Sequence, residues 1–341
     1  MSDIPETRRS LVLRRRPSGE PRREDFSLVE EPMPAPGEGE VLTRTILLSI
    51  DPYMRGRLSD RPSYAPSIAL GEVMTGESVG EVLASGDPAF SPGDLVVGAR
   101  GWQTHTLSPA GVLTPVAREK DIPLGAWLGV LGMPGTTAYS GMKDIGQPKA
   151  GETVVVSAAS GPVGAVAGQL ARRAGARVVG IAGGPEKCVW VQEKFGFDDC
   201  VDHHAANLAD SLALACPNGI DVYFENVGGV VQEIVFRMLN VHARVVMCGM
   251  VAQYNEATFP RGPNLGFVVG RRVRIEGLLV GDHPERFAEW RALAAPWVRD
   301  GSLRFRQTVM DGLDAAPEAL RLVLRGGNFG KMLVRVGPDP A

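Results

Sequence analysis

Residues 153–164, TVVVSAASGPVG, constrain the fold more than any other stretch of the sequence. A β-branched run leads into a turn of small residues, and an amphipathic stretch follows at 163–174. A strand, a tight turn and a helix form the context of the dinucleotide-binding fingerprint GxGxxG. Ala159 stands at the first glycine position, while Gly161 and Gly164 hold the second and third.

This motif alone leaves two interpretations open, because a glycine turn between a strand and a helix is often only a turn. Glycines let the backbone approach a pyrophosphate, whose charge then lies at the helix N-terminus. Pro162 is expected in the first helical turn, where its missing N–H costs little. Because a complete strand–helix–strand unit surrounds the turn, we expect it to bind a dinucleotide.

Apolar runs and amphipathic stretches alternate through the rest of this part of the chain, which predicts a parallel sheet covered by helices on both faces. The overall class is therefore α/β, with a Rossmann-type doubly wound sheet. Strands are expected at 153–159, 177–182, 220–225, 244–249 and 274–280, and helices at 163–174, 186–195 and 230–239.

The first 125 or so residues show a different sequence pattern, in which short apolar runs are separated by Gly- and Pro-rich turns. This spacing predicts a small antiparallel barrel or sandwich, with strands at 41–50, 78–83 and 94–98. Near the end of the chain, helices are expected at 287–299 and 317–325. A last strand, at 331–336, is expected to return to the first domain.

Composition and charge exclude several classes of protein. The net charge of −3 gives no general attraction to nucleic acid or to an anionic membrane. No apolar run approaches the ~20 residues that span a bilayer. Asp3, Glu6 and Glu20 interrupt the Arg-rich start and no apolar segment follows, which argues against a secretory signal. The four cysteines form no CxxC pair, as expected for reduced thiols, and we predict a cytoplasmic protein.

The end of the next predicted strand bears on the choice of cofactor. Sites that prefer NAD usually place Asp or Glu roughly 20 residues on, where it bonds the ribose 2′-hydroxyl. Here Gly183 stands 22 residues after Gly161, and Lys187 follows at the start of a helix. A cation beside small residues suits a 2′-phosphate, which favours NADPH. The alternative is that Lys187 is a solvated helix residue.

The sequence offers no ligand set for a catalytic metal. The early histidine, His105, has no cysteine near it, and His203 and His204 follow Cys200 with a spacing poorly suited to one ion. We read these two histidines as surface or loop residues and predict no metal site.

Tyrosines are then the candidate hydrogen-bond donors. Tyr53 and Tyr64 lie in polar turns of the first part, and Tyr254 follows a strand predicted to end near Gly249. Loops after the carboxyl ends of parallel strands contact ligands, and a phenol can donate to developing enolate charge. Each tyrosine can also be a half-buried packing residue.

These residues carry a family resemblance that covers the chain from about residue 11 to 336. The motifs are DPYMRGR at 51–57, ENVGG at 225–229, CGMVAQYN at 248–255 and NFGK at 328–331, beside the turn at 156–164. In them the chain resembles the zinc-independent medium-chain dehydrogenases/reductases, in the leukotriene dehydrogenase/prostaglandin reductase group.

The resemblance implies a GroES-like β-barrel domain of residues 1–126 and 301–341 and a Rossmann domain of residues 127–300. It also implies a homodimer formed through the Rossmann domains, with NADPH as cofactor. The residue matching Lys187 holds the 2′-phosphate in that family, and those matching Asn226 and Asn328 touch the cofactor. The tyrosine matching Tyr254 lies near the substrate carbonyl. Those matching Tyr53 and Tyr64 line the substrate pocket. The expected cofactor site also includes Ala159, Gly161, Val163, Gly164, Gly183, His203, Cys248, Gly249 and Tyr254.

Two positions depart from the family pattern. His203 stands where relatives often have a tyrosine that helps bind the 2′-phosphate, so its contact is expected to depend on pH. Pro162 stands where relatives often have alanine, and it removes one backbone donor.

The activity that the resemblance implies is conjugate reduction. Hydride from NADPH reaches the β-carbon of an α,β-unsaturated ketone or aldehyde, and Tyr254 stabilises the enolate. Quinone reduction and secondary-alcohol oxidation on the same scaffold are the near alternatives. A non-catalytic NADPH-binding protein is the distant one.

Overall fold

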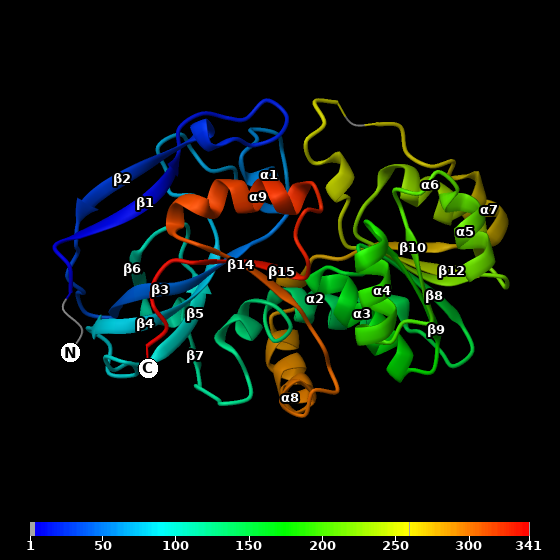
Figure 1. The fold of residues 1–341 in the computed structure, drawn as a ribbon. Helices are drawn as coiled ribbons and strands as arrows, with labels where there is room; N and C mark the ends of the chain where they lie inside the picture. The colour runs from blue at the N-terminus through cyan, green and yellow to red at the C-terminus, as the bar shows by residue number, and fades with distance from the viewer. Residues whose placement is uncertain (1–3, 259, 341) are drawn as a thin grey trace. The chain divides into compact units, whose positions relative to one another are not determined.

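The computed structural model describes residues 4–258 and 260–340. Within them the chain divides into two compact units. One contains the chain up to Leu128 together with the stretch from Gln307 onward, and the other runs from Gly129 to Arg306. Figure 1 shows the elements of both units.

A six-stranded parallel sheet forms the centre of the second unit in the described chain. Across the sheet the strands are β10 (Asp199–Asp202), β9 (Arg177–Ala182), β8 (Thr153–Ser157), β11 (Ile220–Glu225), β12 (Leu239–Met247) and β13 (Arg274–Gly277). Taken in chain order within the unit this is 3-2-1-4-5-6, the Rossmann arrangement, so the predicted doubly wound sheet is confirmed. The strand order reverses between β8 and β11, and this is where such sheets bind ligands.

Helices cover this sheet (Figure 1). β8 is buried along its whole length, as expected for a central parallel strand. A core cluster including Val155, Tyr223, Phe236 and Val245 joins β8, β11 and β12 to the helix after β11. The helices of the unit are α2 (Met133–Ser140), α3 (Pro162–Arg173), α4 (Pro185–Phe195), α5 (Leu208–Ala215), α6 (Gly229–Met238), α7 (Gly266–Arg271) and α8 (Glu285–Arg299).

The first unit is a β-domain. Its strands are β1 (Thr7–Leu13), β2 (Phe26–Pro32), β3 (Glu40–Ile50), β4 (Glu77–Ser85), β5 (Leu95–Ala99), β6 (His105–Pro109), β7 (Thr114–Val116), β14 (Gln307–Asp311) and β15 (Lys331–Arg335), and its α-helices are α1 (Met54–Arg57) and α9 (Ala316–Leu324). Pairing is antiparallel except between β14 and β15, which confirms the predicted GroES-like, largely antiparallel domain. β15 pairs with β3, Met332 opposite Ile50, so the last strand returns to the first domain as predicted.

The unit boundaries differ from the expected ones at two places. Residues 127–128 lie with the first unit instead of the second. Residues 301–306 lie with the second unit instead of the first. The Gln169 side chain accounts for the second difference. Its amide nitrogen donates to the Arg304 carbonyl at 2.8 Å, and its oxygen accepts the Arg304 N–H at 2.9 Å. Leu303 beside it is buried. These contacts fasten the segment to α3, a link that composition alone does not reveal.

Helices of the described residues are all too short or too polar to cross a membrane.

Candidate functional site

The phosphate-type turn lies at the carboxyl end of β8. Ala158 has a φ of 50°, so the left-handed residue of the turn is an alanine and not one of the glycines. The Ala159 N–H donates to the Ile181 carbonyl at 3.0 Å, which ties the turn to β9. Gly161 precedes α3, and Pro162 occupies its first turn as predicted.

The glycines of this turn have different tasks. A Cβ on Gly164 would lie 2.4 Å from the Ala158 carbonyl oxygen, so only glycine lets α3 pack this closely on the turn. A Cβ on Gly161 would meet only the same oxygen within 4 Å, at 3.2 Å. The backbone at Gly161 and Val163 thus begins a twelve-residue helix beside open space, where the N-terminal N–H groups suit an anion.

A second cluster forms at the ends of β9 and β10. A Cβ on Gly183 would lie 3.0 Å from His203 Nε2 and 3.1 Å from His204 Cε1, so both imidazoles approach the turn after β9. Lys187 lies in the first turn of α4 and is half-buried. A Cβ on Gly184 would meet no atom within 4 Å, so the space beside this residue is open.

Electrostatics join these residues into one site. Burial lowers the pKa of His203, and the neighbouring His204 and Lys187 lower it further, while Asp202 opposes them. Burial also lowers the pKa of Lys187. The Lys187 ammonium, together with these imidazoles when they are protonated, places positive charge at this turn, and a bound anion would relieve the repulsion between them.

Asp202 is a residue of this cluster that the sequence analysis missed. Its Oδ1 accepts the N–H of Gly184 at 2.8 Å and that of His204 at 2.9 Å. These donors lower the pKa of Asp202. The carboxylate fixes the turn that presents Lys187. The sequence gives little indication of this role. β10 is a short strand with two aspartates, and its residues resemble those of a loop.

Asn226 and Cys248 begin the turns after β11 and β12. The Asn226 side-chain amide donates to the Ser157 carbonyl at 2.8 Å, so this turn lies against the end of β8. The Cys248 N–H donates to the Glu225 carbonyl at 2.9 Å. Burial raises the pKa of Cys248 to about 12, so this thiol stays protonated and is a poor nucleophile.

Tyr254 lies on the loop after β12. Its phenol oxygen accepts the Met250 N–H at 3.3 Å. A Cβ on Gly249 would lie 3.1 Å from that oxygen, so glycine here gives the phenol room against its own turn. A phenol is a donor as well as an acceptor, so Tyr254 has the chemistry for binding an oxyanion at this edge.

The structure therefore places most of the predicted cofactor-site residues at the carboxyl ends of the strands of the parallel sheet. These are Ala159, Gly161, Val163, Gly164, Gly183, Lys187, His203, Asn226, Cys248, Gly249 and Tyr254.

Tyr53, Tyr64 and Asn328 belong to the first unit. Burial raises the pKa of Tyr53, and Asp51, Glu77 and Tyr64 raise it further. Tyr64 is 65 % exposed. Asn328 precedes β15, and its side-chain amide donates to the Gly330 carbonyl at 2.7 Å.

A buried ion pair connects the motifs that carry Tyr53 and Asn328. Lys331 Nζ lies 2.7 Å from Asp51 Oδ1 and donates to the Ile50 carbonyl at 2.8 Å. The side chains are 2 % and 6 % exposed, and the Ser49 hydroxyl donates to the other Asp51 oxygen. This pair was not predicted, because nothing in the sequence of either motif indicates that the two charges meet.

No group of three or more His, Cys, Asp or Glu side chains in the described part of the chain is placed to hold a metal ion. His203 and His204 have ring centroids 4.1 Å apart and are both exposed.

Comparisons with known proteins agree with this architecture. Residues 9–116 match the family model described as the N-terminal domain of oxidoreductase, and residues 162–298 match the one described as zinc-binding dehydrogenase. The chain is 47 % identical to the NADPH-dependent curcumin reductase of Escherichia coli over 338 residues, 97 % of each chain. It is 38 % identical to the 2-alkenal reductase (NADP(+)-dependent) of Nicotiana tabacum, over 97 % of this chain and 98 % of the relative. The crystal structure of CurA in complex with NADPH from Vibrio vulnificus matches with a TM-score of 0.92 and 43 % identity, covering 97 % of this chain and 100 % of that one.

One unit with a Rossmann sheet that carries the fingerprint turn at its switch point, and one GroES-like unit, define a two-domain dinucleotide-dependent oxidoreductase. The chain belongs to the medium-chain dehydrogenases/reductases, in the leukotriene dehydrogenase/prostaglandin reductase group that its motifs predict.

Proposed function

We propose that this protein is an NADPH-dependent reductase of the carbon–carbon double bond of α,β-unsaturated ketones and aldehydes. One observation carries the proposal. The Tyr254 phenol lies against Gly249, at the same carboxyl end of the parallel sheet as the phosphate-type turn and the Lys187 cluster. The names of the curcumin and 2-alkenal reductases support the same chemistry.

The residues of the second unit fit NADPH. The pyrophosphate would lie at the N-terminus of α3, beside Gly161 and Val163. Lys187 and His203 would hold the 2′-phosphate in the open space at Gly184. Asn226, Cys248 and Gly249 would contact the nicotinamide half.

When bound, NADPH supplies the hydride. Tyr254 donates a hydrogen bond to the substrate carbonyl oxygen, where negative charge develops as the β-carbon is reduced. One donor of this kind contributes about 2.7–4 kcal/mol to the transition state, or 10²–10³ in rate. The enolate then takes a proton at its α-carbon, from solvent or a relayed donor, to give the saturated product. The reaction needs no metal ion, because the phenol provides the electrophilic contact.

A panel of substrates tests this assignment. The purified protein is assayed for NADPH and NADH oxidation with enones, enals and quinones, for the reverse reaction with secondary alcohols, and the products are identified by mass spectrometry. We expect saturated ketones or aldehydes, with NADPH preferred. Quinol products or alcohol oxidation would assign a different reductase activity. Tight NADPH binding without turnover of any substrate would point to a non-catalytic protein.

We further propose that the protein is a homodimer formed through the Rossmann units. β13 is at the edge of the parallel sheet and all four of its residues are exposed. An exposed edge strand is a template for pairing with another chain. Val269 of α7, 80 % exposed, and Ile275 of β13 add apolar surface. Light scattering on the wild type and on Ile275→Lys tests this, with a dimer expected for the first and a monomer for the second.

We also propose that the protein is located in the cytoplasm. Cys188, Cys200, Cys216 and Cys248 are free thiols in the structure, the usual state of cysteines in that compartment. Fractionation of the producing cells tests the location.

A further inference from the structure

One buried carboxylate, Glu225, organises the turn after β11. Its Oε1 accepts the N–H of Val227 at 2.7 Å and that of Gly228 at 3.1 Å. These are the first backbone donors beyond Asn226. The shape of the turn that presents Asn226 is therefore set by the side chain of the residue before it.

The same carboxylate is joined to the phosphate-type turn through Ser157, the last residue of β8. The Ser157 hydroxyl donates to Glu225 Oε1 at 3.0 Å and accepts the Asn226 N–H at 2.8 Å. Ala158 and Ala159 of the phosphate-type turn follow Ser157 directly. One hydroxyl and one carboxylate thus fix the two turns that flank the switch point.

The backbone extends this network to the loop that carries Tyr254. The Glu225 carbonyl accepts the N–H groups of Cys248 at 2.9 Å and Gly249 at 3.1 Å. Beyond it, the Val251 N–H donates to the Asn226 carbonyl at 3.1 Å, and the Ala252 N–H donates to the Val227 carbonyl at 3.0 Å. The Tyr254 loop is therefore attached to the turn that Glu225 shapes.

Burying the Glu225 carboxyl group lowers the stability of the fold. Its side chain and that of Ser157 are 0 % exposed. Burial raises the pKa of Glu225, and the donors from Val227 and Gly228 oppose that rise. A buried carboxyl is expensive unless its hydrogen bonds are made, and an apolar residue of similar size would avoid the expense. The hydrogen bonds that its Oε1 accepts come from Ser157, Val227 and Gly228, which lie at the turns of the candidate site.

We propose that Glu225, acting with Ser157, is a positioning residue that fixes the nicotinamide-side turn and the Tyr254 loop relative to the phosphate-type turn. The inference rests on the proposed function, because it assumes that hydride transfer occurs at this edge. Glu225 makes no contact with the reacting atoms in this account. It determines how well the nicotinamide and the phenol are aligned, and a misplacement of about 1 Å costs on the order of 10²-fold in rate.

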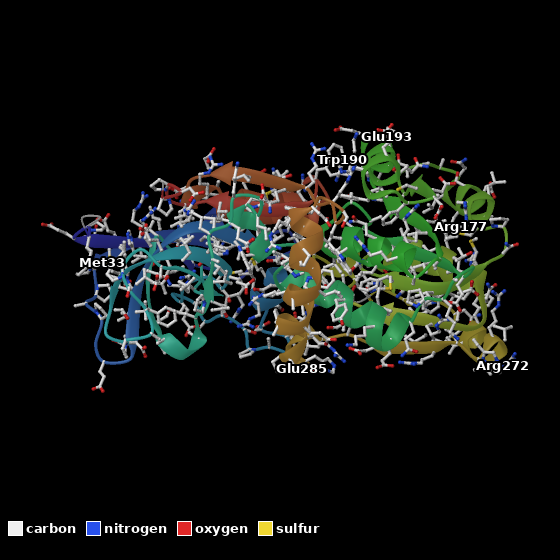
Figure 2. The ribbon with its side chains drawn as sticks, turned by 90° about the horizontal axis from the view of Figure 1, so that it is seen from below. Met33, Arg177, Trp190, Glu193, Arg272 and Glu285 are labelled. Carbon is white, nitrogen blue, oxygen red and sulfur yellow. The ribbon has the colours of Figure 1, made fainter. Side chains whose placement is uncertain are left out.

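Three variants and one control test this role. Glu225→Met keeps the size of the side chain and removes the acceptor. Glu225→Gln keeps an acceptor oxygen for the two N–H groups. Ser157→Ala removes the bridging hydroxyl. Glu193→Gln, an exposed residue of α4 labelled in Figure 2, is the matched control.

The assays are kcat with an enone, the isotope effect with NADPH deuterated at the transferred position, the NADPH affinity, the fluorescence of bound nicotinamide and the melting temperature. We expect Glu225→Met and Ser157→Ala to lower kcat about 10–100-fold, with a larger isotope effect and weaker nicotinamide fluorescence. NADPH affinity should change less than kcat, because the phosphate contacts remain. Glu225→Gln should recover most of the loss, and the control should match the wild type.

Folded Glu225→Met and Ser157→Ala variants with wild-type kcat and isotope effect would overturn the proposal. A loss of kcat that follows only the melted fraction of protein would overturn it as well. If Glu225→Met does not fold, Ser157→Ala carries the comparison alone. If the wild type reduces no enone, the proposed function fails. The nicotinamide fluorescence of the same variants then decides the positioning role separately.

Discussion

Replacing Lys331 with methionine should destabilise the first unit strongly. The ammonium group is one half of a buried ion pair, 2.7 Å from Asp51 Oδ1, with the two side chains 2 % and 6 % exposed. Methionine fills much the same volume and leaves the Asp51 charge without its cation. Removing one partner of a buried pair costs about 3–5 kcal/mol. At roughly 2–4 °C per kcal/mol for a chain of this size, the melting temperature should fall by about 6–20 °C.

Thermal melts followed by circular dichroism measure this loss. Lys120→Met, at an exposed position of the same unit, is the control and should melt with the wild type. Asp51→Asn added to Lys331→Met should recover part of the loss, because it removes the unpaired charge. A melting temperature within about 2 °C of the wild type would refute this reasoning about the pair.

Three further predictions concern the candidate site. Lys187→Ala should weaken NADPH binding about 10–100-fold, the worth of one charged hydrogen bond, and leave NADH binding unchanged; calorimetry measures both, with Lys194→Ala on the same helix as the control. NADPH affinity should rise as the pH falls from about 8 to about 6, because the pKa of His203 is lowered in the free protein and a bound 2′-phosphate favours the imidazolium. His203→Asn should flatten this pH dependence, and the affinity for NADH should not depend on pH in this way. Tyr254→Phe should lower kcat on enones by about 10²–10³ while changing NADPH affinity little, and an unchanged kcat would remove the phenol from the mechanism.

Long apolar patterns made most of the fold predictable. β9 and β11 have the predicted bounds, and β8 is two residues shorter than expected. β10 and α5 were not predicted. β10 has only four residues and α5 has eight, and segments this short show too little periodicity to stand out. β12 begins at Leu239, five residues before the expected start, in a stretch where His242 has a positive φ.

The turns of the candidate site were predictable because each joins a recognisable strand to a recognisable helix or loop. Glu225, Ser157 and Asp202 were not, because their roles arise from hydrogen bonds between segments far apart in the chain. In the sequence, Glu225 is only a carboxylate at the end of an apolar strand. The roles of all the predicted site residues, Tyr254 and Lys187 among them, and the dimer remain predictions.

The position of the transferred hydrogen in the product shows whether this protein reduces a conjugated carbon–carbon double bond. The protein is mixed with an enone and NADPH deuterated at the transferred position, and the product is analysed by NMR. We expect a saturated ketone with deuterium on the β-carbon, formed faster with NADPH than with NADH. Deuterium on the carbinol carbon of an alcohol, or none in the product, would contradict it.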